Sequence, residues 1–241
     1  MKNDNSILLS EASIATSKEV RQGTLLVEDG KIAGIWYRND DGTVNYDGDN
    51  IDYNTLAEKI LGTRAPQAEI IKLPGKVIMA GAIDAHVHFR EPGMTHKADM
   101  ASESKAALLG GVTSFIDMPN TNPPATCLER LREKAALAEG RCFANWGFHI
   151  GADNSNPETL EKCLTEGQAN AFAGIKVFMG SSTGNMLVDK GNALEDLFSI
   201  TGARILIHSE DEAIIKANLE KTKEKFGENI PMREHENIRS R

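Results

Sequence analysis

Two histidines placed two positions apart are the clearest candidates for chemistry in this chain. His86 and His88 lie in residues 81–93, which read Gly-Ala-Ile-Asp-Ala-His-Val-His-Phe-Arg-Glu-Pro-Gly. The side chains of an extended strand alternate between its faces, so both imidazoles would lie on one face and could converge on a metal ion. Neutral imidazoles suit zinc. A His-x-His pair alone is equally compatible with two partly exposed strand histidines, so its surroundings must decide.

Those surroundings predict a strand that ends in polar side chains. The apolar residues 77–80 indicate a buried strand that runs on to the histidines. Asp84 lies on the histidine face, and Arg90 continues that face if the extended path persists past the strand end. Residues 91–93, Glu-Pro-Gly, then break the strand and open a loop.

Lys176 lies inside the apolar run of residues 174–179, and His208 ends the apolar run of residues 204–208. Burying an unpaired ammonium is costly, so Lys176 must reach solvent, find a partner or lose its charge. An uncharged amine can add carbon dioxide, and the two oxygens of the carbamate could bridge two metal ions. His208 would supply a third imidazole. The alternatives are a lysine whose head reaches solvent and a satisfied core histidine.

Arg90 and Asn120 could hold a planar anionic group beside such a metal cluster. The guanidinium of an arginine binds a carboxylate through two parallel hydrogen bonds, and an amide adds one more. The predicted site therefore suits hydrolysis or condensation of an amide-like bond in a molecule that carries a carboxylate. His149 ends another predicted strand and ranks below these residues for a direct role. Four carboxylates could orient ligands, although most such groups are solvated or cap helices: Asp99, Asp117, Glu210 and Asp211.

The elements that would position these residues begin after a small N-terminal β region, residues 1–75. Its clearest signal is a hairpin, with apolar residues 24–27 and 31–35 flanking Asp29-Gly30. Residues 39–50 are rich in Asp, Gly and Asn and are interpreted as a surface excursion. Residues 55–61 could form a short helix, and residues 68–73 a further strand.

Residues 76–241 alternate between apolar strands and helices. Strands are expected at 112–118, 143–150, 173–179 and 204–208 after the histidine strand, with a Gly/Ser-rich loop after the fourth strand. Helices are expected at 98–109, at 127–138, after caps at Asn156 and Asn192, and from Ser209 to Phe226. This alternation implies parallel pairing through right-handed crossovers. The leading fold is an α/β (β/α) barrel with its chemistry at the carboxyl ends of the strands, and the alternative is an open doubly wound sheet.

Composition bounds the class of protein. The chain has 241 residues, of which 40% are hydrophobic and 26% charged, and its formal net charge is −8. This suits a globular protein with a sizeable core, and it argues against a nucleic-acid binder. Three scattered cysteines predict reduced thiols, and no apolar run is long enough to span a bilayer. We expect a cytoplasmic protein that binds a small molecule, with no nucleic-acid or membrane partner; homo-oligomerisation is compatible with the sequence.

At these residues the chain resembles the amidohydrolase superfamily and, within it, the dihydroorotases. The resemblance rests on residues 84–93, Asp-Ala-His-Val-His-Phe-Arg-Glu-Pro-Gly, and on residues 117–123, Asp-Met-Pro-Asn-Thr-Asn-Pro. Related allantoinases usually have Asn where Arg90 stands, and hydantoinases lack the Arg-Glu-Pro-Gly run. The resemblance covers most of residues 76–241, and residues 1–75 resemble the small β-sandwich that accompanies these barrels.

The resemblance implies two zinc ions and an eight-stranded (β/α)8 barrel. His86 and His88 would bind the more buried zinc, a carbamate on Lys176 would bridge both ions, and His208 would bind the second. Arg90 and Asn120 would hold the substrate carboxylate. The implied reaction is the reversible cyclisation of N-carbamoyl-L-aspartate to L-dihydroorotate in pyrimidine synthesis.

The chain departs from the family pattern after its fifth predicted strand. The pattern expects another metal histidine after a sixth strand and a catalytic aspartate after the eighth, and His235 lies in a polar helical stretch that does not fill this gap. Only about five βα units are present, too few to close an eight-stranded barrel. We expect these residues to be the N-terminal part of a longer polypeptide, or a fragment that a second segment completes. Two other readings stay open: another cyclic-amide hydrolase, such as an allantoinase or dihydropyrimidinase, and an inactive scaffold homologue.

Overall fold

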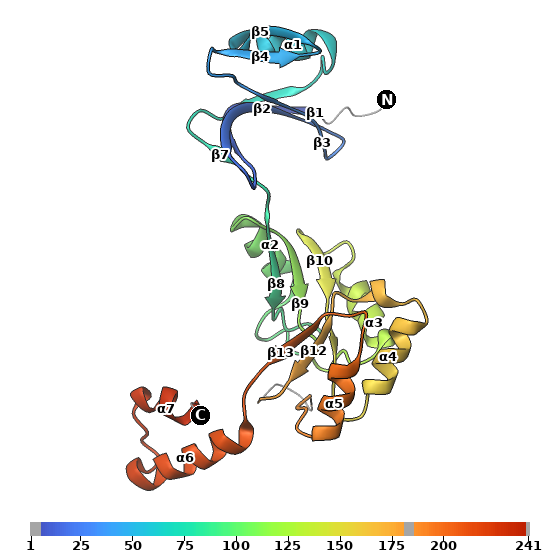
Figure 1. The fold of residues 1–241 in the computed structure, drawn as a ribbon, viewed down its shortest axis with the longest axis vertical. Helices are drawn as coiled ribbons and strands as arrows, with labels where there is room; N and C mark the ends of the chain where they lie inside the picture. Colours follow the sequence, from blue (N-terminus) through green and yellow to red (C-terminus); the bar gives the residue numbers. More distant parts are fainter. Residues whose placement is uncertain (1–5, 181–185, 240–241) are drawn as a thin grey trace. The chain divides into compact units, whose positions relative to one another are not determined.

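A computed structural model describes residues 6–180 and 186–239 of the chain (Figure 1). The chain divides into two compact units, Met1–Ala80 and Gly81–Arg241. Each unit is built around its own hydrophobic core.

The first unit is a β-sheet whose buried face packs against a short helix. Three strands pair antiparallel in the order β3-β2-β1, and two more pair parallel with β1. Leu8 and Leu26 of the sheet share a core with Leu56 and Ile60 of the helix. The elements are β1 (Ser6–Ala15), β2 (Val20–Glu28), β3 (Lys31–Tyr37), β6 (Glu69–Lys72), β7 (Val77–Ile78), the 3-10 turn η1 (Tyr53–Thr55) and α1 (Leu56–Thr63).

The predicted hairpin is confirmed, because Glu28 pairs with Lys31 across a turn in which Asp29 and Gly30 both have positive φ. The predicted helix and the following strand are also confirmed, as α1 and β6.

The prediction that residues 39–50 form only a surface excursion is wrong. They contain β4 (Thr43–Tyr46) and the start of β5 (Asp49–Asp52), which pair antiparallel. Val44 and Tyr46 are buried in the core of the unit. The turn between the strands, Asp47-Gly48, again has positive φ at both residues. The polar composition of the segment hid an alternation in β4 that buries every second residue.

The second unit is an α/β array in which every described strand pair is parallel (Figure 1). One sheet has the order β10-β9-β8 and another β11-β12-β13. His149 alone separates β10 from β11, so the two form one interrupted strand and the chain supplies five successive strands. They are β8 (Ala82–Val87), β9 (Val112–Asp117), β10 (Asn145–Phe148) with β11 (Ile150–Gly151), β12 (Ile175–Phe178) and β13 (Ile205–His208).

A helix follows each of these strands, which confirms the predicted alternation. The helices up to residue 199 share the core of the strands, whereas the helices described after β13 have no buried residue. They are α2 (Met100–Leu109), α3 (Leu128–Ala138), α4 (Pro157–Thr165), α5 (Gly191–Ser199), α6 (Glu212–Phe226) and α7 (His235–Arg239), with short turns η2 (Ala169–Ala171) and η3 (Met232–Glu234). None of the helices within residues 6–180 and 186–239 is long and apolar enough to cross a membrane.

Two predicted helix starts and one predicted cap are corrected. Asp211, not Ser209, caps α6, because its carboxylate accepts the N–H groups of Ala213 and Ile214. Helix α4 begins at Pro157 as expected, but the Asn156 side chain accepts the N–H of Asp153 and does not cap the helix. Helix α5 begins at Gly191, so Asn192 lies inside it.

The apolar residues 77–80 do not begin the histidine strand. Val77 and Ile78 form β7, which pairs with β1 of the first unit, and β8 starts only at Ala82. Nor is β8 buried: Ile83 is 69% exposed. Within the described part of the chain, β8 pairs with β9 alone and β13 with β12 alone, so each has one unpaired edge. The Gly/Ser-rich loop predicted after the fourth strand falls mainly on residues 181–185, outside the described residues.

Candidate metal and substrate site

The structure brings the two strand histidines together as predicted. The ring centroids of His86 and His88 lie 5.4 Å apart at the carboxyl end of β8. Desolvation lowers the pKa of both imidazoles, and the nearby cations Lys176 and Arg90 add to this effect at His86 and His88 respectively. Both rings are therefore biased toward the neutral form that a metal ion requires.

Asn120 fixes the tautomer of His88. The Nδ1 atom of His88 lies 2.9 Å from Oδ1 of Asn120. An amide oxygen only accepts, so Nδ1–H donates and Nε2 keeps its lone pair. Metal-binding histidines are commonly oriented in this way by a hydrogen bond on the other ring nitrogen. Asn120 was predicted only as a substrate-binding group, and the structure shows that it also orients the imidazole.

Lys176 is buried in apolar surroundings at β12, with 1% of the residue exposed. Its ammonium makes no hydrogen bond or ion pair with the residues that the structure describes, and it lies 4.8 Å from the ring centroid of Phe178. Desolvation lowers the pKa of this amine. Burial thus favours the uncharged amine, the form that can react with carbon dioxide.

His208 ends β13, beside β12, and is bonded to a carboxylate. Its Nε2 lies 2.7 Å from Oε2 of Glu210, and Glu210 also pairs with Arg239. Arg239 first and His208 second lower the pKa of Glu210, so the carboxylate is ionised and Nε2–H donates to it. This leaves the Nδ1 lone pair of His208 for a ligand.

These donors fit a metal site in chemistry, but they are not gathered into one cluster. Among residues 6–180 and 186–239, no group of three or more His, Cys, Asp or Glu side chains converges. The charges of Lys176, His149 and His208 nonetheless all lower the pKa of His86, so these residues lie within electrostatic range of it. Two adjacent imidazoles biased toward the neutral form and a third imidazole held by a carboxylate are ligands of the kind that zinc accepts, and the buried amine would need conversion to a carbamate to join them.

Arg90 follows the histidine strand with its backbone in the left-handed region, at φ 66°. That conformation costs on the order of 1 kcal/mol or more in a residue with a side chain. The half-buried guanidinium makes no hydrogen bond or ion pair within the described part of the chain. It is therefore an available donor beside His88.

A buried ion pair that the sequence analysis missed holds the strand ends in place. Lys134 of α3 lies 2.7 Å from Oδ2 of Asp117 and donates to the carbonyl of Met118, also at 2.7 Å. The other oxygen of Asp117 accepts the N–H of Phe89 at 2.8 Å, directly after His88. The sequence analysis names Asp117 as a group that could orient ligands, but it does not predict Lys134 as its partner. A signal existed, because Lys134 lies on the buried stripe of α3 with Leu131 and Ala138.

His149 is a positioning group in this structure. It is buried between β10 and β11, and its Nε2–H donates to the carbonyl of Ala85 at 3.0 Å. This bond links the third strand to the residue before His86. Its placement agrees with the lower rank that the sequence analysis gave it for direct chemistry.

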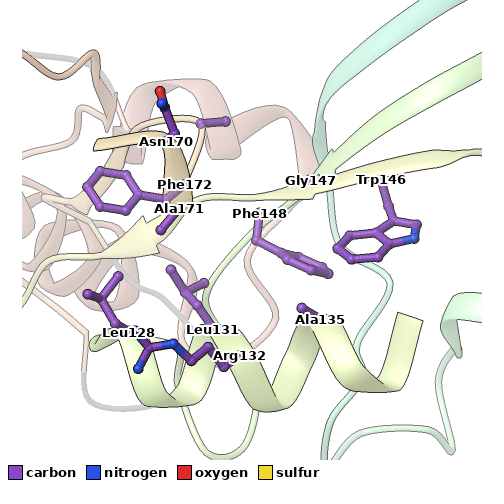
Figure 2. A pocket seen from close by; sticks show the side chains of 11 residues that line it. Leu128, Leu131, Arg132, Ala135, Trp146, Gly147, Phe148, Asn170, Ala171 and Phe172 are labelled. Atoms are coloured by element: carbon purple, nitrogen blue, oxygen red, sulfur yellow. The ribbon is translucent and has the colours of Figure 1, made fainter. Parts of the chain in front are cut away.

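A groove of the second unit lies away from these residues (Figure 2). It has a volume of about 480 Å³ and is lined by apolar side chains of α3, β10 and residues 170–173. Trp146 and Phe148 point into it, with ring centroids 5.4 Å apart. Because side chains alternate along a strand, the groove lies on the face of β10 opposite His149. None of the predicted site residues lines it.

Comparison with known proteins identifies relatives of the second unit. The profile described as "Amidohydrolase family" matches residues 77–232. A dihydroorotase from Methanosarcina mazei is 37% identical over 145 residues, 59% of this chain and 31% of the relative. A dihydroorotase from Halobacterium salinarum is 41% identical over 113 residues, 46% of this chain and 25% of the relative.

Solved structures show a similar fold. The L-hydantoinase (dihydropyrimidinase) from Arthrobacter aurescens matches with a TM-score of 0.77 and 24% identity, over 98% of this chain and 47% of that one. This chain therefore spans about half the length of that structure, and its match covers about a third of the length of the Methanosarcina mazei enzyme.

Proposed function

The chain belongs to the amidohydrolase family, and we propose that it carries active-site residues of a dihydroorotase. This enzyme catalyses the reversible, zinc-dependent cyclisation of N-carbamoyl-L-aspartate to L-dihydroorotate in de novo pyrimidine biosynthesis. The proposal rests on the similarity to the curated dihydroorotases. The match covers only part of the length of those proteins, so the proposal extends beyond what the match itself shows.

The observation that carries the proposal is the arrangement of Arg90 and Asn120 around His88. Asn120 is hydrogen-bonded to the His88 ring, and Arg90 follows His88 two residues later with a guanidinium that has no partner among residues 6–180 and 186–239. A planar carboxylate bound by these donors would place the rest of a small cyclic amide beside the imidazole pair. A cyclic amide without a carboxylate would leave Arg90 unsatisfied.

We propose two zinc ions as cofactors, held by His86, His88, a carbamate on Lys176, and His208. Zinc supplies Lewis-acid activation of water and of an amide carbonyl. The amine of Lys176 attacks the carbon of carbon dioxide and loses one proton, which gives the anionic carbamate. Arg90 and Asn120 hold the substrate carboxylate, and the bond from Asn120 keeps Nε2 of His88 unprotonated. The general acid and base of the reaction are not assigned among residues 1–241.

We further propose that the five parallel strands belong to a (β/α)8 barrel and the first unit to a β-sandwich, with domains at residues 1–75 and 76–241. In such barrels the active site lies at the carboxyl ends of the strands, where we place the proposed site. We expect a cytoplasmic protein, in line with free thiols at Cys127, Cys142 and Cys163. Its partner would be a small carboxylate-bearing substrate, without nucleic acid or membrane, in a monomer or a homo-oligomer.

The test is hydrolysis of L-dihydroorotate by the purified protein, with zinc content and intact mass measured on the same sample. We expect turnover and about two zinc ions for each active site. Arg90→Met should raise the KM for L-dihydroorotate far more than it lowers the zinc content. Zinc-loaded protein that does not turn over this substrate would contradict the proposal.

A second candidate is a hydantoinase-type cyclic-amide hydrolase, which the fold similarity to the Arthrobacter aurescens enzyme favours. A substrate panel separates the two, because such an enzyme would prefer hydantoin or dihydrouracil, which lack the carboxylate. An inactive scaffold homologue would show neither turnover nor zinc.

A further inference from the structure

We propose that Arg141 is a positioning residue for carboxylate recognition, acting on Arg90 through an ion pair with the buried Glu91. The inference rests on the proposed function, because it takes Arg90 as the residue that holds the substrate carboxylate. It assigns a role to a residue 50 positions after Glu91 of the Arg-Glu-Pro-Gly run.

The first step is that Arg90 needs support from its neighbours. Its left-handed backbone, at φ 66°, is unfavourable for a residue with a side chain. Its guanidinium has no partner in the described part of the chain that could hold it. The direction of the side chain is therefore set by how Phe89 and Glu91 are fixed on either side.

Phe89 is fixed by the buried ion pair already described, through its N–H bond to Asp117. Glu91 is fixed by three contacts to other elements. Oε1 pairs with Nη1 of Arg141 at 2.8 Å, and Oε2 accepts from Nη2 of Arg141 at 3.3 Å. Oε2 also accepts the N–H of Met100, the first residue of α2, at 3.0 Å.

Arg141 is what makes this anchor stable. Glu91 is buried, and a buried carboxylate without a cation would be strongly disfavoured. Arg141 supplies a guanidinium that binds both carboxylate oxygens, and it also donates to the carbonyl of Leu137 at 3.0 Å. The ion pair thus ties the loop after β8 to the end of α3.

The same loop is tied to the segment that carries Asn120. The N–H of Asn122 donates to the carbonyl of Pro92 at 3.1 Å. Gly93, at φ 81°, lies so close that a Cβ there would be 1.9 Å from the carbonyl oxygen of Asn122. A shift of Glu91 would therefore be felt by both proposed carboxylate donors. His86 is held within β8, and the backbone directly after His88 is held by the bond from the Phe89 N–H to Asp117.

The loss of Arg141 should therefore affect some ligands and not others. Loss of Arg141 should weaken the binding of ligands that carry a carboxylate, and it should spare both the zinc content and ligands that lack the group. A displacement of the guanidinium by about 1 Å is enough for an effect of tenfold or more.

The experiment compares Arg141→Met with Arg141→Lys and with Arg130→Met in the purified, zinc-loaded protein. Arg130 is a matched control: its side chain is 44% exposed against 42% for Arg141, and it pairs with Glu133 on α3. Binding of orotate and of uracil is measured by calorimetry, and exchange of the Met100 amide by hydrogen–deuterium exchange.

We expect Arg141→Met to weaken orotate binding about tenfold, with faster exchange at Met100 and unchanged zinc content and uracil binding. Arg141→Lys should recover part of the loss, and Arg130→Met should match the wild type. Equal orotate affinity in Arg141→Met and wild type would overturn the inference, and so would equal losses for orotate and uracil. Wild-type protein that does not bind orotate would overturn it as well.

The proposed function can fail separately. A protein that binds orotate through Arg90 and Arg141 but does not hydrolyse L-dihydroorotate would refute the enzymatic activity and support the positioning role. In an active protein, Arg141→Met should raise the KM for L-dihydroorotate and leave kcat nearly unchanged, which a general loss of structure would not do.

Discussion

Two lysines of the second unit are equally buried and are treated in opposite ways. Lys134 and Lys176 are each 1% exposed, and each ammonium lies near an aromatic ring, Phe148 or Phe178. Burial lowers the pKa of both. At Lys134 the carboxylate of Asp117 opposes that effect, whereas at Lys176 desolvation is the only cause acting.

The difference separates a structural cation from a reactive amine. Lys134 is satisfied by Asp117 and the Met118 carbonyl, and the group it forms fixes the ends of β8 and β9. Lys176 is left without such a partner among the described residues, so desolvation favours its uncharged amine at the next pair of strands. The strand ends beside Lys134 and Asp117 are therefore held in place by the chain itself. The strand end at Lys176 is suited to completion by carbon dioxide and metal ions, as proposed above.

The largest effect that tests this comparison is expected for Lys134→Met. It leaves Asp117 charged, buried and unpaired, so the second unit should lose about 3–5 kcal/mol of unfolding free energy. Urea unfolding followed by the fluorescence of Trp146 reports on this unit. A Trp36→Phe background removes the other indole, which belongs to the first unit.

A double variant is the control for Lys134→Met. In Asp117→Asn/Lys134→Met the charge is removed from both partners and an amide oxygen remains for the Phe89 N–H. Most of the lost stability should therefore return. If Lys134→Met alone costs less than 1 kcal/mol, the pair does not organise the strand ends.

Lys176→Met should change the unfolding free energy in the opposite direction to Lys134→Met, and by less. Removing an unpaired buried amine relieves desolvation, so metal-free protein should keep its stability or gain about 1 kcal/mol. Zinc binding and activity should nevertheless be lost with the bridging group. The measurement is urea unfolding of metal-free protein together with zinc content after reloading; destabilisation as large as that of Lys134→Met would show that Lys176 is structural.

Local patterns in the sequence were enough to predict much of the fold. The Asp29-Gly30 hairpin and the alternation of strands and helices after residue 81 were predicted because the turn and helix signals lie within a few residues of each other. The hairpin at Asp47-Gly48 was missed because its strands are four residues each and mostly polar. Residues 77–80 were assigned to the wrong strand because an apolar run does not reveal its pairing partner.

The same limit applies to the site. Polar residues at strand ends are visible in the sequence, and His86 and His88 come together as predicted. The partners that hold the site, Lys134 and Arg141, lie 16 and 50 residues from the groups they bind, Met118 and Glu91. Such pairs depend on how helices pack on the sheet, which no local pattern contains.

The smallest expected effect is the change of unfolding free energy with pH that His149 causes. This residue lies within electrostatic range of both Lys176 and Asp117, the partner of Lys134. Desolvation lowers the pKa of His149 below its ordinary value of 6.5, so the folded protein holds this ring neutral. As pH falls below about 6.5 the unfolded chain binds a proton that the folded chain does not, and unfolding free energy decreases by up to about 1.4 kcal/mol per pH unit. Above that pH His149 has no such effect.

His149→Gln keeps a donor for the Ala85 carbonyl and should flatten the decline of unfolding free energy between pH 6.5 and 5. The control His235→Gln, at an exposed residue of α7, should leave that decline unchanged. Urea unfolding of metal-free protein across this range measures both, and equal slopes for His149→Gln and wild type would show that the buried ring is not held neutral.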